Sequence, residues 1–293
     1  MQVKWYPGHM ARALNQLEEG LKKVDVVLEI LDARIPSSSS NPEITRLLVS
    51  KNHIILLNKA DLADEQVTRD WCDYFSETSP AIPFNAITGK GMGELDKAIT
   101  RETEELTAKW QRQGRNPRNP RLMVLGIPNV GKSALINRMA ARKRARTGDK
   151  PGVTRGMQWI KLSRNYDLLD TPGILWPDMD DEHVALKLAI TGAIKQDHFD
   201  SEQVGYSLCK ILLARGYGDY LIERYNLDNL PQHPWDLLQE IGRMRGCLIA
   251  GGKVDTERAA NLILREFQRG QLGRISLERP EDVPRGEEFQ DEE

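Results

Sequence analysis

The stretch RLMVLGIPNVGKSALINRMAARKRA, residues 121–145, decides the fold. Its apolar start, RLMVLG (121–126), is typical of a buried strand, and its second half has helical spacing. Between them, GIPNVGKS (126–133) fits G-x-x-x-x-G-K-[ST], and its place between a strand and a helix argues against a chance match. Gly126 and Gly131 permit the tight turn, while N–H groups of the loop and of the helix N-terminus point at phosphate oxygens. We therefore predict a nucleotide site here.

Two side chains of this phosphate loop have specific expected roles. Lys132 is predicted to contact the β- and γ-phosphates, and the Ser133 hydroxyl is predicted to bind Mg²⁺. The loop residues predicted to contact the nucleotide are Asn129, Val130, Gly131, Lys132, Ser133 and Ala134.

The identity of the base follows from NKAD (58–61). Asp61 can accept hydrogen bonds from N1–H and the exocyclic amino group of guanine, whereas adenine offers no such pair of donors. Asn58 is predicted to bond the base edge and to tie down the phosphate loop, and the stem of Lys59 to cover the ring face. The alternative, a strand-to-helix turn with an aspartate N-cap, is disfavoured because a phosphate loop is also present.

A second guanine contact is predicted in NAITG (85–89), where the backbone N–H of Ala86 would donate to guanine O6. Asn85 stands where this motif more often has serine, a small departure from the pattern.

Two further motifs are predicted to sense the γ-phosphate. In DTPG (170–173), Asp170 would bind Mg²⁺ through a water, and the Gly173 N–H would bond the γ-phosphate. In PGVTR (151–155), Thr154 would complete the Mg²⁺ shell only when a γ-phosphate is present, so that hydrolysis releases the segment.

Buried strands alternate with helices along the first 175 residues, which predicts an α/β fold with a mostly parallel sheet. The predicted strands are 24–33, 53–61, 81–87, 121–126, 157–163 (an edge strand) and 166–173. In such sheets ligands bind at the carboxyl ends of the strands, where these motifs all fall. The guanine-reading motifs precede the phosphate loop, the reverse of the order in ordinary small GTPases. The sequence therefore predicts a circularly permuted P-loop GTPase fold.

The chain divides into three predicted regions. Residues 1–177 form the GTPase domain, and residues 178–277 have helical spacing throughout, which predicts a separate all-α domain. Residues 278–293 form an acidic tail that we expect to be disordered. The last switch motif leads almost directly into the helical domain, so nucleotide state could be passed to it.

Composition excludes several classes of protein. The chain has 293 residues, of which 40% are hydrophobic and 29% charged, as in ordinary globular proteins. Its three cysteines form no C-x-x-C pair, which indicates a reducing compartment and argues against a cysteine zinc site. No apolar run approaches the roughly 20 residues of a membrane span. These features predict a cytoplasmic protein that does not enter membranes.

Charge is distributed unevenly. The net charge is −2, but residues 278–293 carry eight acids and two arginines, a net of −6, which leaves +4 on the rest. Residues 109–121 hold five basic residues and no acid, and residues 138–155 hold seven basic residues against one aspartate. These blocks are either solvated surface segments or contacts for an RNA backbone.

The order of the motifs resembles a known family. WYPGHM (5–10), LDARIP (31–36), NKAD, GIPNVGKS, PGVTR and DTPGIL follow one another as in the circularly permuted ribosome biogenesis GTPases, the YlqF-like ribosome biogenesis GTPase A family. The mitochondrial ribosome-associated GTPase is a relative of that family. The resemblance covers nearly all of the first 280 residues and excludes the acidic tail. It implies GTP hydrolysis coupled to a late step of large-subunit assembly, with the helical domain contacting ribosomal RNA.

Hydrolysis needs a group that orients the attacking water. Many GTPases have Gln or His immediately after DTPG, but this chain has Ile174, which cannot form a hydrogen bond through its side chain. The resemblance places His9 near the switches, where a neutral imidazole could position the water; alternatively His9 caps the first helix or contacts RNA. In GTPases similar to this one, an Asn at the position of Asn129 helps bind a K⁺ that acts as an arginine finger does.

The leading hypothesis is therefore a GTP-hydrolysing switch that acts on the large ribosomal subunit and its rRNA. The protein is expected to be a monomer and to bind GTP and GDP with Mg²⁺, and K⁺ in addition. A different class, a GTP-gated RNA- or protein-binding module with negligible turnover and a non-ribosomal target, is consistent with Ile174. A transferase or kinase is disfavoured by the guanine-reading motifs and by the absence of an acceptor-binding motif.

Overall fold

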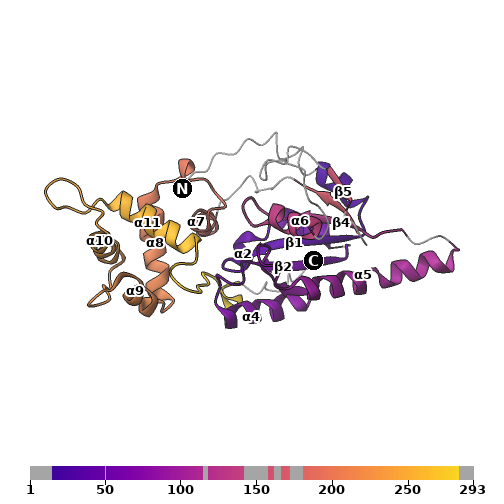
Figure 1. Cartoon of the computed structure of the whole chain (residues 1–293), viewed down its shortest axis with the longest axis horizontal. Helices are drawn as coiled ribbons and strands as arrows, with labels where there is room; N and C mark the ends of the chain where they lie inside the picture. The colour runs from indigo at the N-terminus through magenta and orange to yellow at the C-terminus, as the bar shows by residue number, and fades with distance from the viewer. Residues whose placement is uncertain are drawn as a thin grey trace, which may run out of the picture.

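The computed structural model describes residues 15–49, 51–114, 118–141, 158–161, 166–171 and 181–283. Figure 1 shows two lobes side by side: a sheet with flanking helices, built from the first part of the chain, and a group of helices built from the last part.

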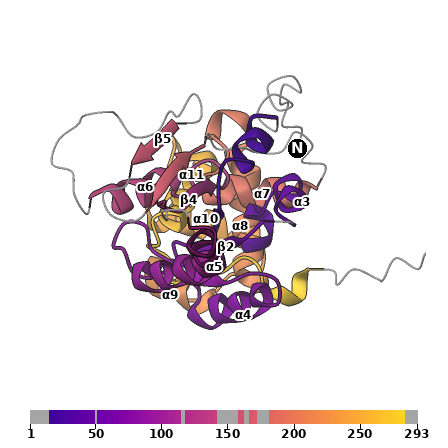
Figure 2. The same ribbon diagram turned by 90° about the vertical axis from the view of Figure 1, so that its right-hand side faces the viewer.

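The sheet of the first lobe has six strands in the order β3-β2-β1-β4-β6-β5. All neighbouring strands are parallel except the edge strand β5, which pairs antiparallel with β6 and lies at the rim of the molecule in Figures 1 and 2. The mostly parallel sheet and its edge strand are thus confirmed. The strands are β1 (Val26–Asp32), β2 (His53–Asn58), β3 (Ala81–Pro83), β4 (Arg121–Leu125), β5 (Gln158–Lys161) and β6 (Asp167–Asp170).

Helices cover both faces of this sheet. Successive residues of β2 point to opposite faces: Ile54 and Leu56 belong to a core that includes α5, whereas Ile55 and Leu57 pack with Trp71 of α4. Residues 15–21 are also helical. The other helices of the lobe are α2 (Pro36–Ser39), α3 (Pro42–Leu48), α4 (Glu65–Ser76), α5 (Met92–Arg112) and α6 (Lys132–Ala141).

The second lobe is helical, as expected, and between residues 181 and 283 its only β pairing is an isolated bridge, Leu248 to Val254. Its centre is the contact between α8 and α11. A Cβ at Gly205 would lie 2.5 Å from the Ala260 Cβ, so the two helix backbones approach closely because position 205 is glycine. The elements are α7 (Glu182–Thr191), η1 (Gln196–His198), α8 (Ser201–Ala214), α9 (Gly218–Tyr225), α10 (Pro234–Met244), α11 (Thr256–Gln268) and η2 (Pro280–Asp282).

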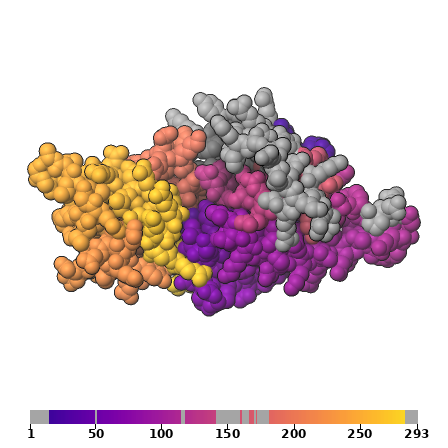
Figure 3. Space-filling model, in the orientation of Figure 1, coloured from indigo at the N-terminus to yellow at the C-terminus, as the bar shows by residue number. Residues whose placement is uncertain are grey.

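After α11 the chain returns to the first lobe. The N–H of Ile275 donates to the Leu62 carbonyl at 2.9 Å, and the N–H of Leu277 donates to the Arg34 carbonyl at 2.8 Å. Figure 3 shows this yellow segment lying directly against the indigo part of the chain. Residues 272–283, here called the return segment, therefore join the two lobes.

The expected start of a disordered tail at residue 278 is wrong. Glu278 is buried, pairs with Lys187 of α7 at 2.9 Å, and accepts hydrogen bonds from the N–H and hydroxyl of Ser38. A charge that looks like the first acid of a solvated tail is instead a buried carboxylate paired with a partly buried ammonium, which composition alone cannot reveal. Residues 284–293 and the predicted boundary at 177/178 lie outside the described residues.

Candidate guanine nucleotide site

The phosphate loop depends on both of its predicted glycines. At Gly126, φ is +149° and a Cβ would lie 2.6 Å from the Ile30 carbonyl oxygen of β1. At Gly131, φ is +117° and a Cβ would lie 2.1 Å from Asn58 Nδ2. Because a side chain at either position would clash, the loop can pass between β1 and NKAD only with glycine at these two points.

The ammonium of Lys132 lies inside the loop. Its Nζ is 2.8 Å from the carbonyl oxygens of both Gly126 and Ile127, and the residue is 8% exposed. Lys132 begins α6, and Ser133 and Ala134 follow in the first turn, both partly exposed. A positive charge framed by the loop backbone at a helix N-terminus is suited to binding phosphate.

Asn58 connects three of the predicted motifs. Its Nδ2 donates to the Val130 carbonyl at 2.6 Å, and its Oδ1 accepts from the Ala86 N–H at 2.9 Å. The predicted tie between NKAD and the phosphate loop is present in the structure. The Ala86 N–H, predicted to donate to guanine O6, here donates to Asn58, so a bound guanine would have to share it. Both ends of the buried amide thus fix the relative positions of the loops.

A buried ion network positions Lys59. Its Nζ lies 2.8 Å from Asp32 Oδ2, and its backbone has a φ of +61°. Asp32 also accepts from Arg34 Nη2 at 2.7 Å and Nε at 2.9 Å. Burial opposes ionisation of Asp32, but the charges of Arg34 and Lys59 outweigh it and keep the pKa of Asp32 well below its ordinary value. The anchored ammonium restricts the Lys59 stem that is predicted to cover the base.

Neither Asp32 nor Arg34 was predicted from the sequence as a site residue. Arg34 is 1% exposed, lies with its guanidinium 5.0 Å from the ring centre of Phe267, and donates from Nη1 to the Phe267 carbonyl at 3.4 Å. Phe267 belongs to α11, so this network extends from NKAD into the helical lobe. LDAR at the end of a buried strand was the available signal, since two opposite charges there require partners.

The remaining guanine-reading residues have different environments. Asp61 is exposed in the turn after β2, where its carboxylate can reach a ligand. Asn85 is 7% exposed, and its Oδ1 accepts from the N–H groups of Ile87 at 2.9 Å and Thr88 at 2.8 Å. In this structure Asn85 shapes the loop that presents Ala86, a role its short amide performs well in turns.

The structure describes the switch motifs only in part. The Asp170 backbone ends β6, which pairs with β4, and the Thr171 hydroxyl donates to the Val124 carbonyl of β4 at 2.6 Å. DTPG therefore begins beside the strand that leads into the phosphate loop. His9, Thr154, Gly173 and Ile174 lie outside the described residues.

Asn129 joins the phosphate loop to the helical lobe. Its backbone has a φ of +58°, and its Nδ2 donates at 2.9 Å to the carbonyl of Gly192, the residue that caps the C-terminus of α7. The amide nitrogen is used in this bond, whereas the amide oxygen is the atom that a K⁺ would bind. Phosphates bound at residues 126–133 would thus lie next to a contact between the lobes.

One of the basic blocks is partly occupied by contacts within the protein. Arg118 forms two hydrogen bonds with Asp25, at 2.7 and 2.8 Å, and stacks on Trp110 at 4.7 Å. Arg121 stacks on Trp159 at 5.3 Å. These two arginines of residues 109–121 thus have partners within the protein, while the Arg118 side chain keeps 41% of its surface exposed, and the two predicted alternatives for the block stay predictions.

The phosphate loop, NKAD and the permuted strand order together define a guanine-nucleotide-binding P-loop protein. The family model described as 50S ribosome-binding GTPase matches residues 121–201. Ribosome biogenesis GTPase A of Bacillus cereus is 44% identical over 292 residues, which are 99% of this chain and 98% of that protein. The corresponding protein of Thermotoga maritima is 32% identical, with 96% of each chain covered. The chain belongs to the ribosome biogenesis GTPase A family and is a GTPase.

Further comparisons agree with this assignment. Mitochondrial ribosome-associated GTPase 1 of Mus musculus is 32% identical over 94% of this chain and 90% of that protein. The solved structure of GDP-bound TM YlqF superposes with a TM-score of 0.65 at 29% identity, covering 91% of this chain and all of that one. GNP-bound YlqF from T. maritima superposes with a TM-score of 0.63 at 28% identity, covering 93% of this chain and all of that one. The circularly permuted GTPase fold is thereby confirmed.

Proposed function

We propose that this GTPase binds the precursor of the large ribosomal subunit and promotes a late step of its assembly. The proposal is supported by the ribosomal names of its relatives and by the contact between the Asn129 side chain and Gly192. That contact carries the argument for a switch, because it places a helical lobe against the loop predicted to hold the phosphates.

Two routes connect the nucleotide to the helical lobe. One runs from the phosphate loop through Asn129 to the end of α7, and the other runs from Lys59 through Asp32 and Arg34 to α11. A nucleotide that binds the two arrangements of the lobes with different affinity shifts the balance between them. Loss of the γ-phosphate is thus proposed to change the arrangement of the helical lobe, which is the lobe proposed to contact RNA.

The RNA contact is proposed to lie on α11. Arg258 and Arg265 of α11 and Arg269 at its C-cap are exposed and are separated by seven and four residues, which places them on one side of the helix. They line one groove together with Asn261 and Gln271 and with three acidic residues, Asp255, Glu257 and Glu266, of which Glu266 is paired with Arg224 at 2.7 Å. A row of guanidiniums suits the phosphates of an RNA backbone, and affinity that comes from such contacts falls with salt.

Co-sedimentation with ribosomal subunits tests the proposal. The full chain is centrifuged with isolated large and small subunits in the presence of GDP or of a non-hydrolysable GTP analogue. We expect association with the large subunit that depends on the nucleotide. Failure to associate with either subunit in a nucleotide-dependent manner would overturn the ribosomal assignment and favour another RNA or protein target.

The Mg²⁺ that accompanies GTP in this class of enzyme is proposed to bind Ser133 and Thr154 directly and Asp170 through a water. The observed chemistry fits a hard cation, since Ser133 offers a hydroxyl oxygen in the first turn of α6. Among the described residues no group of three or more His, Cys, Asp or Glu side chains could hold a metal. The ion is therefore expected to depend on the nucleotide's own oxygens.

His9 is proposed to orient the attacking water in place of the absent Gln or His at position 174. We expect His9→Ala to reduce hydrolysis stimulated by the large subunit about 100-fold, within the usual range for a lost general base, with GTP affinity unchanged. Single-turnover phosphate release and nucleotide titration measure the two quantities. Unchanged stimulated hydrolysis would exclude the role, and absence of any stimulation in the unaltered protein would favour a GTP-gated binding module.

K⁺ is proposed to bind the Asn129 amide oxygen and to supply charge between the α- and γ-phosphates. We expect GTP hydrolysis to be about tenfold faster in KCl than in NaCl at equal ionic strength, because one added positive charge near the phosphates stabilises the transition state. We also expect Asn129→Asp to change the ratio of the rates in the two salts. Steady-state phosphate release in the two salts is the measurement. Equal rates in both salts would contradict the proposal.

The cytoplasm is the proposed location, and a monomer the proposed form. Among the described residues no helix is long and apolar enough to cross a membrane. Cys72, Cys209 and Cys247 are free thiols, which is compatible with a reducing compartment.

A further inference from the structure

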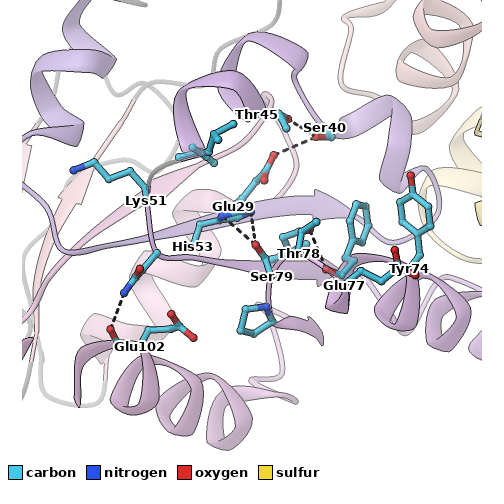
Figure 4. Close-up of a pocket in the computed structure, with 16 residues that line it drawn as sticks. Glu29, Ser40, Thr45, Lys51, His53, Tyr74, Glu77, Thr78, Ser79 and Glu102 are labelled. Carbon is cyan, nitrogen blue, oxygen red and sulfur yellow. Dashed lines mark hydrogen bonds between the residues drawn. The ribbon is translucent and has the colours of Figure 1, made fainter. Parts of the chain in front are cut away.

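A second cavity lies away from the nucleotide site. It has a volume of about 800 Å³ and lies on the face of the sheet that α4 covers, with α3 on its other side. His53 at the start of β2 and Ser79 before β3 line it, so it is near the amino ends of strands whose carboxyl ends carry the guanine motifs. Figure 4 shows its lining residues. None of the residues predicted to bind GTP lines this cavity.

A buried carboxyl group points into the cavity. Glu29 stands in the middle of β1, where its neighbours in the strand are apolar, and it is 4% exposed. Its Oε1 accepts a hydrogen bond from the Ser40 hydroxyl at 3.3 Å. Burial raises the pKa of Glu29 to about 7. A buried carboxylate is costly unless a positive charge accompanies it.

The surroundings do not supply that positive charge. No ion pair to Glu29 is formed within the described part of the chain, and Lys51 points away from it in Figure 4. Burial lowers the pKa of His53, which favours the neutral ring, and that ring is within 2.9 Å of the Ser79 hydroxyl. The titratable groups that line the cavity besides Glu29 are Lys51, His53, Tyr74, Glu77 and Glu102.

The walls suit an apolar stem. Leu48 of α3 and Ile55 of β2 supply aliphatic surface, and Tyr74 and Phe75 of α4 supply two aromatic rings. Aromatic rings attract cations as well as alkyl groups. An occupant that matches this lining has a positive charge at one end, for Glu29, and a hydrocarbon chain behind it.

We propose that this cavity is a binding site for an organic cation, an ammonium or guanidinium group on an alkyl stem, whose charge pairs with Glu29. The cation can belong to a free alkylamine or to an arginine or lysine side chain of a partner protein. In both cases the site is distinct from the nucleotide site and is lined by Glu29 of β1, the strand that ends in Asp32.

Binding of butylguanidinium to the full chain with GDP tests the site, with neutral butylurea as the isosteric control. Isothermal titration calorimetry at pH 8 is expected to detect binding of butylguanidinium. Butylurea is expected to bind with an affinity lower by about tenfold or more, because one charge-assisted contact is lost. At pH 6, where Glu29 is mostly protonated, affinity is expected to fall. Equal affinity of the cation and the urea would overturn the proposal.

Three variants locate the binding. Glu29→Gln keeps the shape of the side chain and is expected to lower the affinity for butylguanidinium about tenfold. Glu77→Gln at the same cavity is expected to change that affinity less than about twofold. Thr45→Trp is expected to fill the cavity while the Glu29 carboxyl and its bond from Ser40 stay in place, at the loss of the contact between the Ser40 and Thr45 hydroxyls. GDP affinity of each variant verifies folding, and if Glu29→Gln binds butylguanidinium as tightly as the unaltered protein the proposal fails.

The source of the cation is distinguished by two further probes, spermidine and an end-blocked Gly-Arg-Gly peptide. Tighter binding of spermidine than of the peptide assigns the site to free amines, and the reverse order assigns it to a protein side chain. If Glu29→Gln leaves the binding of both probes unchanged, the cavity is not a cation site. GTP hydrolysis and subunit binding are measured separately, so either hypothesis can fail alone.

Discussion

Asp61→Asn is expected to change the base that the protein binds from guanine to xanthine. The Asp61 carboxylate is exposed in the turn after β2 and is proposed to accept from N1–H and the exocyclic amino group of guanine. Xanthine has a carbonyl in place of that amino group, so it requires a donor, which the asparagine amide supplies. Towards guanine the asparagine amide would accept only from N1–H, without the charge, and its NH2 would face the exocyclic amino group donor to donor, so affinity for GTP should fall about 100-fold or more. Affinity for xanthosine triphosphate should rise.

Competition of GTP and xanthosine triphosphate against a fluorescent guanine nucleotide measures both changes. Asp64→Asn is a matched control three residues along the chain, because the Asp64 carboxylate caps α4 by accepting from the Val67 N–H at 3.0 Å. That variant should retain its preference for GTP. Retention of GTP affinity by Asp61→Asn would show that this carboxylate does not read the base.

Much of the fold could be predicted because its information is local. Val26–Asp32 is buried along its whole length, as a nearly unbroken aliphatic run indicates, and GIPNVGKS fits its pattern within eight consecutive residues. The convergence of the motifs on one edge of the sheet could be predicted because ligands bind at the carboxyl ends of parallel strands, whereas the order of the strands was not predicted. The tie from Asn58 to the phosphate loop was predictable for the same reason.

What could not be predicted depends on contacts between distant segments. Glu278 has the composition of a tail, yet it is buried against Ser38 and Lys187, and neither partner is near it in sequence. Arg118 belongs to a basic block, but Asp25 and Trp110 engage its charge. Sequence patterns report the periodicity of an element and not the identity of its tertiary partner.

Glu29 is intermediate between the features that the sequence could predict and those that it could not. An acid within VDVVLEILDA is unusual in a strand buried on both faces, so the sequence contained a signal that the motif search passed over. The chemical meaning of that signal needed the cavity, because a buried carboxyl can also be satisfied by a neighbouring cation. The structure distinguishes these possibilities by showing where Lys51 and His53 lie.

The buried network around Asp32 leads to the second large expected effect. Asp32→Ala removes the counter-charge of Arg34, which is 1% exposed, and the anchor of Lys59. An unpaired buried guanidinium should lower the free energy of unfolding by about 3–5 kcal/mol. Urea unfolding monitored by circular dichroism measures this change. Glu43→Ala, which breaks an exposed ion pair with Arg46, should cost only about 0–1 kcal/mol.

A double variant separates stability from nucleotide positioning. Asp32→Ala with Arg34→Met replaces the buried pair by apolar groups, which commonly restores most of the lost stability. Lys59 stays without its anchor, so affinity for GDP should remain about tenfold below that of the unaltered protein even when the chain is folded, since one charge-assisted contact is missing. Recovery of full GDP affinity in the double variant would show that Asp32 serves folding alone. Weakened GDP binding at restored stability would show that the contact of Asp32 with Lys59 positions NKAD for the nucleotide, separately from the contribution of the buried pair to folding.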